Sequence, residues 1–471
     1  MRATALAALG LVGCAPKTAE QTSEKSTGLA STGPVSPEGF EEIAPLVKPD
    51  LSDLEMMKER MTLEDLNEIR LEQIEACEDY VCDDGTVIPK IWVQVRETVD
   101  GIGYGCGAQN FTDAKSFEGW KMLCNNDEDL AAIYVYAPIG KRFNALDASV
   151  ATGLTEERCA EALKQLAYNG MLFHVNIAGM DFYSHQRLAH GVTESSMNMY
   201  PVEGFIPAYG YGMKGADREQ MPYPAYYPLP VNKDIVLDES IIPYDDIEGL
   251  LDRHNKFCVS PCQCVYLQGT DPNVPDIHDR DAIKNYVLPD GVHLEKCYTF
   301  GEEAQFYIDQ GIGREVSRDE MREMLQRSID EGCVMQSCFT KYTEVICSCN
   351  SLGCLPSMHP SAVVDNHNTN YYANLSHYNL MYKKDNCIKC GTCVERCPMD
   401  AIEMDEDGYP SIAGVCVRCG QCAYVCPNGV RKLKAKDEAE MPAMPEDLLE
   451  WGNIDAVYRY GKGMWPKTEE K

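Results

Sequence analysis

The sequence lacks the short motifs of several large enzyme classes and is poor in basic residues. It contains no P-loop, no G-x-S-x-G nucleophile elbow and no H-E-x-x-H motif, so ATPase, acyl-transfer and zinc-protease functions have no support. Only 42 Lys and Arg residues stand against 74 Asp and Glu residues, which gives a formal charge of −32. Such a charge repels nucleic acid and anionic lipid surfaces, so we expect no nucleic-acid partner.

The N-terminal apolar run, in MRATALAALGLVGCAPK, is far shorter than the ~20 residues needed to span a bilayer. Arg2, followed by a short apolar run that ends in L-V-G-C, resembles a lipoprotein signal with Cys14 as the lipidated residue. The Ser-, Thr-, Gly- and Pro-rich stretch after it suits a flexible tether, so residues 1–39 are predicted as signal and tether. We expect an exported protein, held by lipid alone on the outer face of the cytoplasmic membrane; the alternative is a cytoplasmic protein. A signal for folded, cofactor-loaded cargo usually has twin arginines, so we expect the natural chain to start upstream of Met1.

The rest of the chain divides by composition into several regions. At 471 residues, 44% of them hydrophobic, it is long enough for roughly three domains of about 150 residues each. Apolar residues recur every three or four positions over 40–75, which predicts helix, and the region 40–124 continues into a Gly-rich stretch. Tyr, Pro and Gly dominate 200–231, which predicts an extended segment wrapped over the body, at the start of a cysteine-rich region spanning 200–382. A C-terminal tail covers 433–471.

Residues 125–199 have the pattern of a winged helix. Three predicted helices are followed by two predicted strands, at 171–177 and 181–188. The third helix, 155–169, would be the recognition helix of a DNA-binding protein, but it carries three Glu against one Arg and one Lys. Because a DNA-reading helix needs positive charge, we expect a winged-helix-like scaffold rather than a DNA-binding domain.

Cysteine is abundant, with 23 residues in the chain, and eight of them form two runs of identical spacing. Each run reads C-x2-C-x2-C-x3-C-P; the cysteines are Cys387, Cys390, Cys393 and Cys397, then Cys416, Cys419, Cys422 and Cys426. This is the signature of bacterial ferredoxins with two [4Fe–4S] clusters, which residues 383–432 resemble closely. The fourth cysteine of each run is predicted to bind the other run's cluster. The predicted ligands are Cys387, Cys390, Cys393 and Cys426 for cluster 1, and Cys416, Cys419, Cys422 and Cys397 for cluster 2.

A second group of cysteines does not have ferredoxin spacing. It contains two Cys-x-Cys pairs far apart in the sequence, one cysteine between them and one after them: Cys262, Cys264, Cys297, Cys347, Cys349 and Cys354. If helical segments bring the two pairs together, the group would bind a third iron–sulfur cluster. The alternatives are a disulfide or structural role in an exported protein, and a zinc or substrate-reducing site. The predicted fold is α+β and multi-domain, with a winged-helix-like region, a cysteine-rich α/loop region and a C-terminal bacterial-type two-cluster ferredoxin.

The order of these parts resembles a bacterial family of 4Fe–4S dicluster-domain proteins over residues 125–432. The resemblance rests on the winged-helix pattern, the PCQC loop, the helix pair in EKCYTFGEEAQFYIDQGIGREVSRDEM, the CSCNSLGC cluster and the C-terminal ferredoxin. In that family the first loop usually reads Cys-x-Cys-Arg and the second is a denser cysteine run. Here Val265 replaces the Arg, and CSCNSLGC replaces the denser run. The resemblance implies electron transfer more than it implies a particular reaction.

We therefore expect an exported iron–sulfur protein that relays electrons to or from an oxidoreductase partner, either membrane-bound or soluble. The acidic surface would attract a basic docking face on that partner. The alternative is a terminal reductase that acts on a small organic acceptor, with an added corrinoid or flavin. Exported reductive dehalogenases have a similar signal, linker and cluster pair, although their second cluster run is usually shortened and both runs here are complete. A redox-sensing regulator is a third alternative, opposed by the acidic recognition helix and the export signal.

Overall fold

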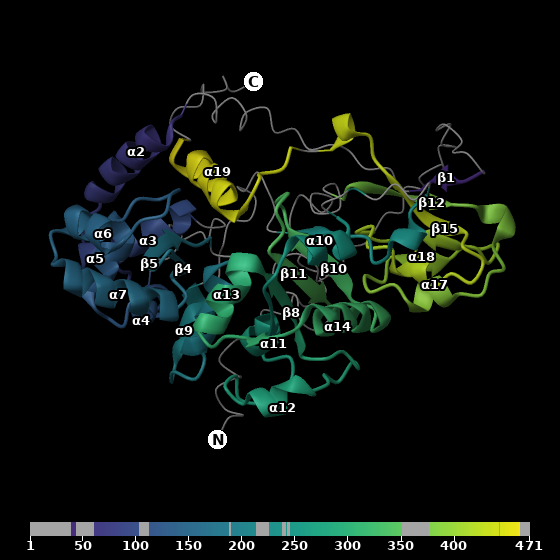
Figure 1. Cartoon of the computed structure of the whole chain (residues 1–471), viewed down its shortest axis with the longest axis horizontal. Helices are drawn as coiled ribbons and strands as arrows, with labels where there is room; N and C mark the ends of the chain where they lie inside the picture. Colours follow the sequence, from purple (N-terminus) through teal and green to yellow (C-terminus); the bar gives the residue numbers. More distant parts are fainter. Residues whose placement is uncertain are drawn as a thin grey trace.

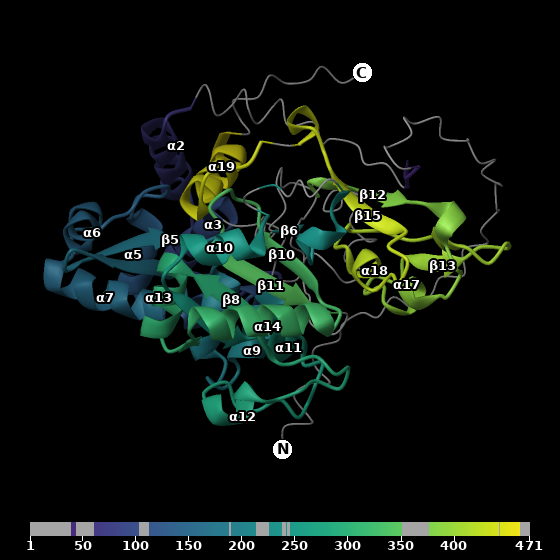
Figure 2. The ribbon, with the colours of Figure 1, turned by 45° about the vertical axis from the view of Figure 1, so that its right-hand side comes forward.

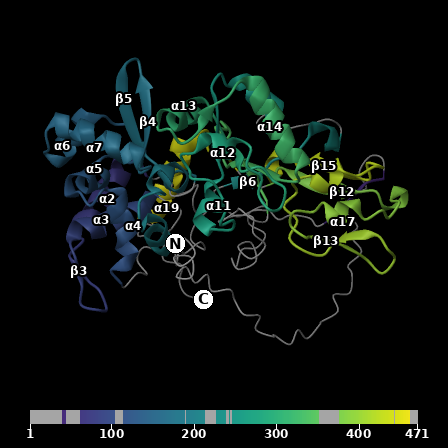
Figure 3. The same ribbon diagram turned by 90° about the horizontal axis from the view of Figure 1, so that it is seen from below.

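The chain forms three parts arranged in a row in this computed structural model, with a helical part, a central sheet and a small cysteine-rich module (Figure 1, Figure 3). Helices and strands both contribute to the core, so the predicted α+β class is confirmed. The structure describes residues 39–43, 61–102, 113–187, 190–212, 226–237, 242, 245–350, 376–441 and 443–461.

The helical part consists of eight helices and two short hairpins in the described residues up to 212. Its elements are α2 (Leu63–Glu75), β2 (Tyr80–Val81), β3 (Val87–Ile88), α3 (Lys90–Ile102), α4 (Lys115–Leu123), α5 (Glu128–Tyr136), α6 (Ala145–Thr152), α7 (Glu156–Tyr168), β4 (Leu172–Ile177), β5 (Met180–His185), α8 (Val192–Ser195) and α9 (Phe205–Gly212), with a 3-10 turn at Ser196–Met199. The three helices and the hairpin predicted for 125–199 are present in the predicted order, as α5, α6, α7, β4 and β5. Their assignment as a winged helix stays a prediction.

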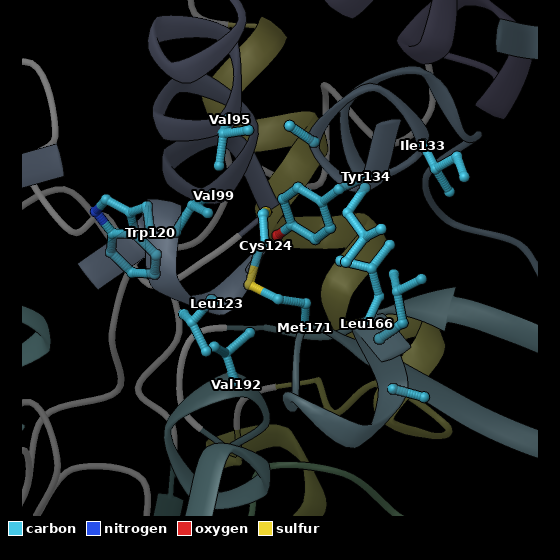
Figure 4. Close-up of a cluster of buried hydrophobic side chains, with 14 of the residues drawn as sticks. Val95, Val99, Trp120, Leu123, Cys124, Ile133, Tyr134, Leu166, Met171 and Val192 are labelled. Carbon is cyan, nitrogen blue, oxygen red and sulfur yellow. The ribbon is translucent and has the colours of Figure 1, made fainter. Parts of the chain in front are cut away.

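Helix α7 illustrates how this part folds. Thr155 caps it, because its side chain accepts a hydrogen bond from the backbone N–H of Arg158. The apolar residues at helical spacing, among them Leu163 and Leu166, are buried. They face a core in which Cys124 lies among Trp120, Leu166 and other apolar side chains (Figure 4). Burial raises the pKa of the Cys124 thiol, so this cysteine is an inert core residue.

The central part is an antiparallel sheet of six strands in the order β6-β10-β11-β8-β7-β9. The strands are β6 (Tyr226–Pro228), β7 (Phe257–Pro261), β8 (Glu295–Phe300), β9 (Arg314–Glu315), β10 (Val334–Cys338) and β11 (Val345–Cys349). The helices around it are α10 (Ile247–Arg253), α11 (Gln263–Gln268), α12 (Arg280–Lys284), α13 (Gly301–Asp309) and α14 (Arg318–Asp330), with a 3-10 turn at Lys233–Ile235. Helix α14 covers one face of the sheet, and Met321, Leu325 and Ile329 are buried there (Figure 2).

Two predictions for this region are wrong. The cysteine-rich region is a sheet and not an α/loop region, because several of its cysteines lie in short segments, such as VMQSC and VICSC, that form strands buried on both faces. The segment 200–231 is not simply an extended wrap, because its described residues include helix α9 and strand β6. Helix α9 accommodates Pro207 in its first turn, where a proline removes no helical hydrogen bond.

The C-terminal module contains two small antiparallel sheets and two one-turn helices. Its elements are β12 (Tyr378–Tyr382), α17 (Thr392–Glu395), β13 (Ile402–Met404), β14 (Pro410–Ile412), α18 (Gln421–Tyr424) and β15 (Arg431–Ala435), with a 3-10 turn at Lys384–Asn386. Strand β1 (Glu41–Glu42) pairs with β12, so helix does not begin at residue 40 as predicted; an edge strand forms there instead.

The region predicted as a tail returns to the far end of the molecule. After a 3-10 turn at Glu438–Glu440, helix α19 (Leu448–Gly461) packs against α2 and α3 of the helical part (Figure 1). Trp451 is fully buried, and the guanidinium of Arg187 stacks 3.1 Å from the centroid of its ring. Within the described residues, no helix combines the length and the hydrophobicity needed to cross a membrane.

Candidate metal centres

Two matching loops in the C-terminal module hold its cysteines. In each C-x-x-C loop a basic residue takes a left-handed conformation, Lys389 with φ 58° and Arg418 with φ 58°, followed two residues later by a left-handed glycine, Gly391 or Gly420. These residues bend the chain tightly enough to turn backbone N–H groups toward the sulfur atoms. The N–H of Lys389, for example, donates to the Sγ of Cys387 over 3.4 Å.

Four cysteines from the two runs line one small cavity of about 20 Å³ in the module. They are Cys387, Cys390, Cys393 and Cys426, which we call the first cysteine set. Four thiolates around one cavity are the donor set that a [4Fe–4S] cluster requires, so the residues present fit that group. Cys426, the fourth cysteine of the second run, thus lies with three cysteines of the first run, in agreement with the prediction that the fourth cysteine binds the other run's cluster. The role of each cysteine as a ligand stays a prediction. The hydrogen bond from the Thr392 hydroxyl to Cys390 lowers the pKa of this exposed thiol, which favours the thiolate that binds iron.

The second cysteine set lies deeper in the molecule. It consists of Cys416, Cys419, Cys422 and Cys397. Burial, followed by the nearby thiols, raises the pKa of Cys419 and Cys422. Neither of these two is exposed, in contrast to Cys390 of the first set. The two sets therefore differ in their access to solvent.

Hydrogen bonds from the buried side chain of Gln421 hold the module against the central sheet. Its Nε2 donates to the carbonyl oxygens of Ile329, over 3.0 Å, and Cys333, over 2.7 Å. Its Oε1 accepts a hydrogen bond of 2.9 Å from the Nε of Arg396. Because Gln421 directly precedes Cys422, these contacts place the second cysteine set against the end of α14 and the start of β10.

One buried apolar cluster joins the second cysteine set to the sheet. From the module it contains Cys419, Met399 and Val417, and from the sheet it contains Tyr226, Val334, Cys338 and Cys349. The partly buried Cys397, Cys416 and Cys347 pack against it. Residues of the predicted third site thus pack in the same cluster as the residues of predicted cluster 2.

The described cysteines of the predicted third site lie in or beside three neighbouring strands. We call them the sheet cysteines; they are Cys262 and Cys264 after β7, Cys297 in β8, and Cys347 and Cys349 in β11. Because β8 lies between β7 and β11, Cys297 pairs with Cys347 on one side and with Ser260 on the other. The structure therefore brings Cys297 between the two Cys-x-Cys segments. Cys354, like Cys14, lies outside the described residues.

Thiol contacts within the sheet cysteines perturb their acidity. Hydrogen bonding to Cys297 raises the pKa of Cys347, while the contact with Cys349 opposes this effect and burial adds to it. A hydrogen bond from Cys264, assisted by the Lys296 ammonium, lowers the pKa of Cys262 to about 6 despite burial. In the described part of the chain, no three His, Cys, Asp or Glu side chains are grouped as ligands for a single metal ion. Thiols in mutual contact are the soft sulfur donors that an iron–sulfur cluster requires.

Several buried charged residues around the sheet cysteines were not singled out by the sequence. Lys296 is buried, and its Nζ donates to Asn350 Oδ1 over 2.5 Å; its positive charge acts on Cys262 and Cys349. Glu194 is also buried and accepts a hydrogen bond of 3.0 Å from Gln263, the residue between Cys262 and Cys264. The sequence signal for such residues is weak, because charged residues occur in almost every segment and only the fold shows which are buried.

Comparison with known proteins identifies the C-terminal module. The family model for the 4Fe-4S dicluster domain matches residues 386–430. No curated protein and no solved structure gives a significant match to the chain. The match covers both cysteine runs of the module. The chain therefore carries an iron–sulfur, ferredoxin-type domain that binds 4Fe–4S cluster and has a role in electron transfer.

Proposed function

We propose that the protein conducts electrons through three iron–sulfur centres in series. The first cysteine set holds the first centre, the second set holds the next, and the sheet cysteines hold the third. The observation that carries the proposal is one packed cluster that buries Cys419 of the module and Cys349 of the sheet. The partly buried Cys397, Cys416 and Cys347 pack against it. Centres held by residues of one packed cluster lie near each other, and burial keeps water away from the path between them.

The two cysteine sets of the module differ in exposure, and this difference indicates at which end of the path a partner protein docks. Cys390 is exposed, whereas Cys419 and Cys422 are buried against the sheet. A redox partner protein, membrane-bound or soluble, would therefore exchange electrons at the first cysteine set. The formal charge of −32 favours a partner with a basic docking face.

Iron and acid-labile sulfide per chain, together with EPR of the dithionite-reduced protein, test this proposal. Three [4Fe–4S] centres give about twelve irons per chain, and two give about eight. We expect about twelve irons and a spectrum broadened by magnetic coupling between centres. A value of about eight, with only ferredoxin-type signals, would remove the third centre from the proposal.

We further propose that the protein is exported and anchored to the membrane by lipid on Cys14. The support is the N-terminal sequence pattern, which lies outside the described residues. Labelling of cells with a radioactive fatty acid tests the idea: the wild-type protein should incorporate label and sediment with membranes, and Cys14→Ser should do neither. Unlabelled wild-type protein in the cytoplasmic fraction would support the alternative location.

The second candidate function is a terminal reductase for a small organic acceptor. The observation that favours it is a cavity of about 360 Å³ whose wall contains His190 and Glu303, two buried residues near the sheet cysteines. Flavin or cobalt in the purified protein would support a reductase with a further cofactor. A protein with iron alone would leave the electron-transfer proposal as the simpler account.

A further inference from the structure

A cavity of about 360 Å³ lies where hairpin β4–β5, the start of α13 and the start of α19 meet. This volume falls in the range of small-molecule sites, about 300–1,000 Å³. Apolar side chains line part of it, including Phe173, Leu448 and Leu449. Polar side chains, including His190 and Glu344, line the rest. The cavity thus combines apolar contact area with a few buried polar groups.

Part of the cavity wall connects it to the sheet cysteines. His190 is buried, and its Nε2 lies 2.9 Å from Oε1 of Glu303. Its Nδ1 lies 3.3 Å from the hydroxyl of Tyr226, which also donates to Glu194 over 3.2 Å. Cys347 packs against the buried cluster that contains Tyr226, and burial, followed by this thiol, raises the pKa of the Tyr226 hydroxyl. One histidine and one tyrosine therefore separate the cavity from the sheet cysteines.

The charges around the cavity largely compensate one another. Arg142 forms an ion pair with Glu302, and the wall also contains Arg187 and Asp447, which have opposite charges. Burial opposes a charge on His190, but the nearby carboxylates of Glu194 and Glu303 outweigh it and raise the pKa of this histidine. Such a site suits an uncharged molecule whose oxygen atoms accept hydrogen bonds.

Glu344 adds a buried acid to the cavity. Burial, followed by the charges of Glu303 and Glu302, raises its pKa to about 8, so the carboxyl group is protonated at neutral pH. The charged and titratable groups near it are Glu302 and Glu303 of α13, His254 before β7, Tyr342 in the same strand connection, and Arg142, which pairs with Glu302.

We propose that this cavity binds the head group of a quinone, which exchanges electrons with the sheet cysteines' iron–sulfur centre and protons with Glu344 and His190. The inference rests on the proposed function, because the electrons come from the redox partner through the module. Iron–sulfur centres carry single electrons, and a quinone is an organic acceptor that takes up two electrons one at a time. Quinone, two electrons and two protons give the quinol: both C=O bonds become C–O–H, and each oxygen receives one proton.

The protons come from two sides of the cavity. Glu344 donates one proton and is left as a carboxylate. The other proton reaches the quinone through the His190 imidazole, which stays hydrogen-bonded to Glu303. Solvent that enters the cavity then restores both protons. Because Glu344 loses its proton as the pH rises through about 8, quinone reduction should slow over that range.

Menadione, a soluble naphthoquinone, is the probe for two measurements on the full-length, cluster-loaded protein. Isothermal titration calorimetry of the oxidised protein measures binding without any electron transfer. Stopped-flow reoxidation of the dithionite-reduced protein measures electron transfer. We expect saturable binding to the wild type and to Glu344→Gln, since the amide keeps the size of the side chain. We expect reoxidation of Glu344→Gln to be about 100-fold slower and to lose its dependence on pH near 8, because the acid is gone.

Leu449→Trp is the variant that fills the cavity. Leu449 is half-buried at its edge, so the larger side chain should abolish menadione binding while the thermal midpoint and the iron content stay unchanged. Glu161→Gln is the matched control: Glu161 is exposed and lines a different surface opening, so this variant should behave as the wild type in both measurements.

The outcomes separate this inference from the proposed function. Menadione that binds neither the oxidised nor the reduced protein, in a sample with about twelve irons per chain, would overturn the quinone site and leave the electron path intact. Equal reoxidation rates for the wild type, Glu344→Gln and Leu449→Trp would also overturn it. Binding that Leu449→Trp abolishes, in a protein with about eight irons, would support the cavity as the quinone site and refute the third centre.

Discussion

The C-terminal module and the central sheet both gather cysteines, but they do so in different ways. In the module, each run places four cysteines within eleven residues, Cys387–Cys397 and Cys416–Cys426, and tight left-handed turns at Lys389 and Arg418 orient them. In the sheet, the cysteines come from three segments that strand pairing brings together. The module's site is encoded locally, whereas the sheet's site depends on the register of the whole sheet.

Strand register makes the sheet site sensitive to small shifts. Side chains alternate between the two faces of a strand, so a slip of one residue would move Cys297 away from Cys347. The module depends less on distant segments, because three cysteines of the first set come from one run with its own tight turns, and only Cys426 comes from the other run. Changes in the sheet should therefore affect the third centre and spare the two centres of the module.

Replacement of Cys297 by alanine should have the largest effect. This variant removes the cysteine that lies between the two Cys-x-Cys segments, so iron should fall from about twelve to about eight per chain. The ferredoxin-type EPR signals should remain. Iron analysis and EPR of the purified variant check both expectations.

Cys258→Ala is the matched control for Cys297→Ala. Cys258 is buried in the neighbouring strand β7, where it pairs with Thr299, and burial raises the pKa of its thiol to about 12. It should keep all of its iron, because the Cys258 thiol interacts with Thr299, Arg280 and Arg314, outside the thiol contacts that join Cys297 and Cys347. Loss of iron from Cys258→Ala, or retention by Cys297→Ala, would contradict the assignment of the sheet cysteines.

The difference between the two sites explains how much the sequence could predict. The module was predicted well because the spacing of the cysteines in each run follows directly from the tight turns that orient them. The dicluster domain was found at residues 386–430, as expected. The helices and hairpin of 125–199 were also predictable from periodicity and capping residues such as Thr155. These features depend on neighbours within a few positions in the chain.

Other features depend on distant segments and were not predictable. The cysteine-rich region was predicted as helices and loops, since a five-residue segment such as VMQSC is too short to distinguish a buried strand from a buried helix segment. The return of α19 to the helical part depends on the burial of Trp451. The cavity at His190 and Glu303 is formed by residues that are more than 100 positions apart, as their hydrogen bond shows.

Arg314→Met should destabilise the sheet without changing any cysteine. The guanidinium of Arg314 forms two hydrogen bonds of 2.9 Å with the buried carboxylate of Glu295, two residues before Cys297. Removing one partner of a buried ion pair leaves an uncompensated charge and costs about 3–5 kcal/mol. Chemical denaturation should show this loss, and iron of the third centre should be released at lower denaturant than iron of the module.

Lys256→Met provides the control for Arg314→Met. Lys256 forms an ion pair of 2.8 Å with Glu315 in the adjacent strand, but both side chains reach solvent. An exposed pair contributes about 0–1 kcal/mol, so this variant should retain nearly all of its stability and iron. If the two variants lose the same free energy of unfolding, the buried ion pair between Arg314 and Glu295 does not stabilise the sheet.

Gln421→Leu should have the smallest effect, because it weakens only the contact between the module and the sheet. The leucine keeps most of the volume but leaves the buried carbonyl oxygen of Cys333 without the 2.7 Å hydrogen bond that Gln421 donates. An unsatisfied buried polar group costs about 1–3 kcal/mol. Iron content should stay unchanged, while the magnetic coupling between the second and third centres, measured by EPR, should weaken as the two parts separate. Gln326→Leu is the control, because Gln326 donates a hydrogen bond to Tyr424 of the module from an exposed position at the same boundary. If both variants lose the same amount of magnetic coupling, Gln421 does not set the spacing between the centres.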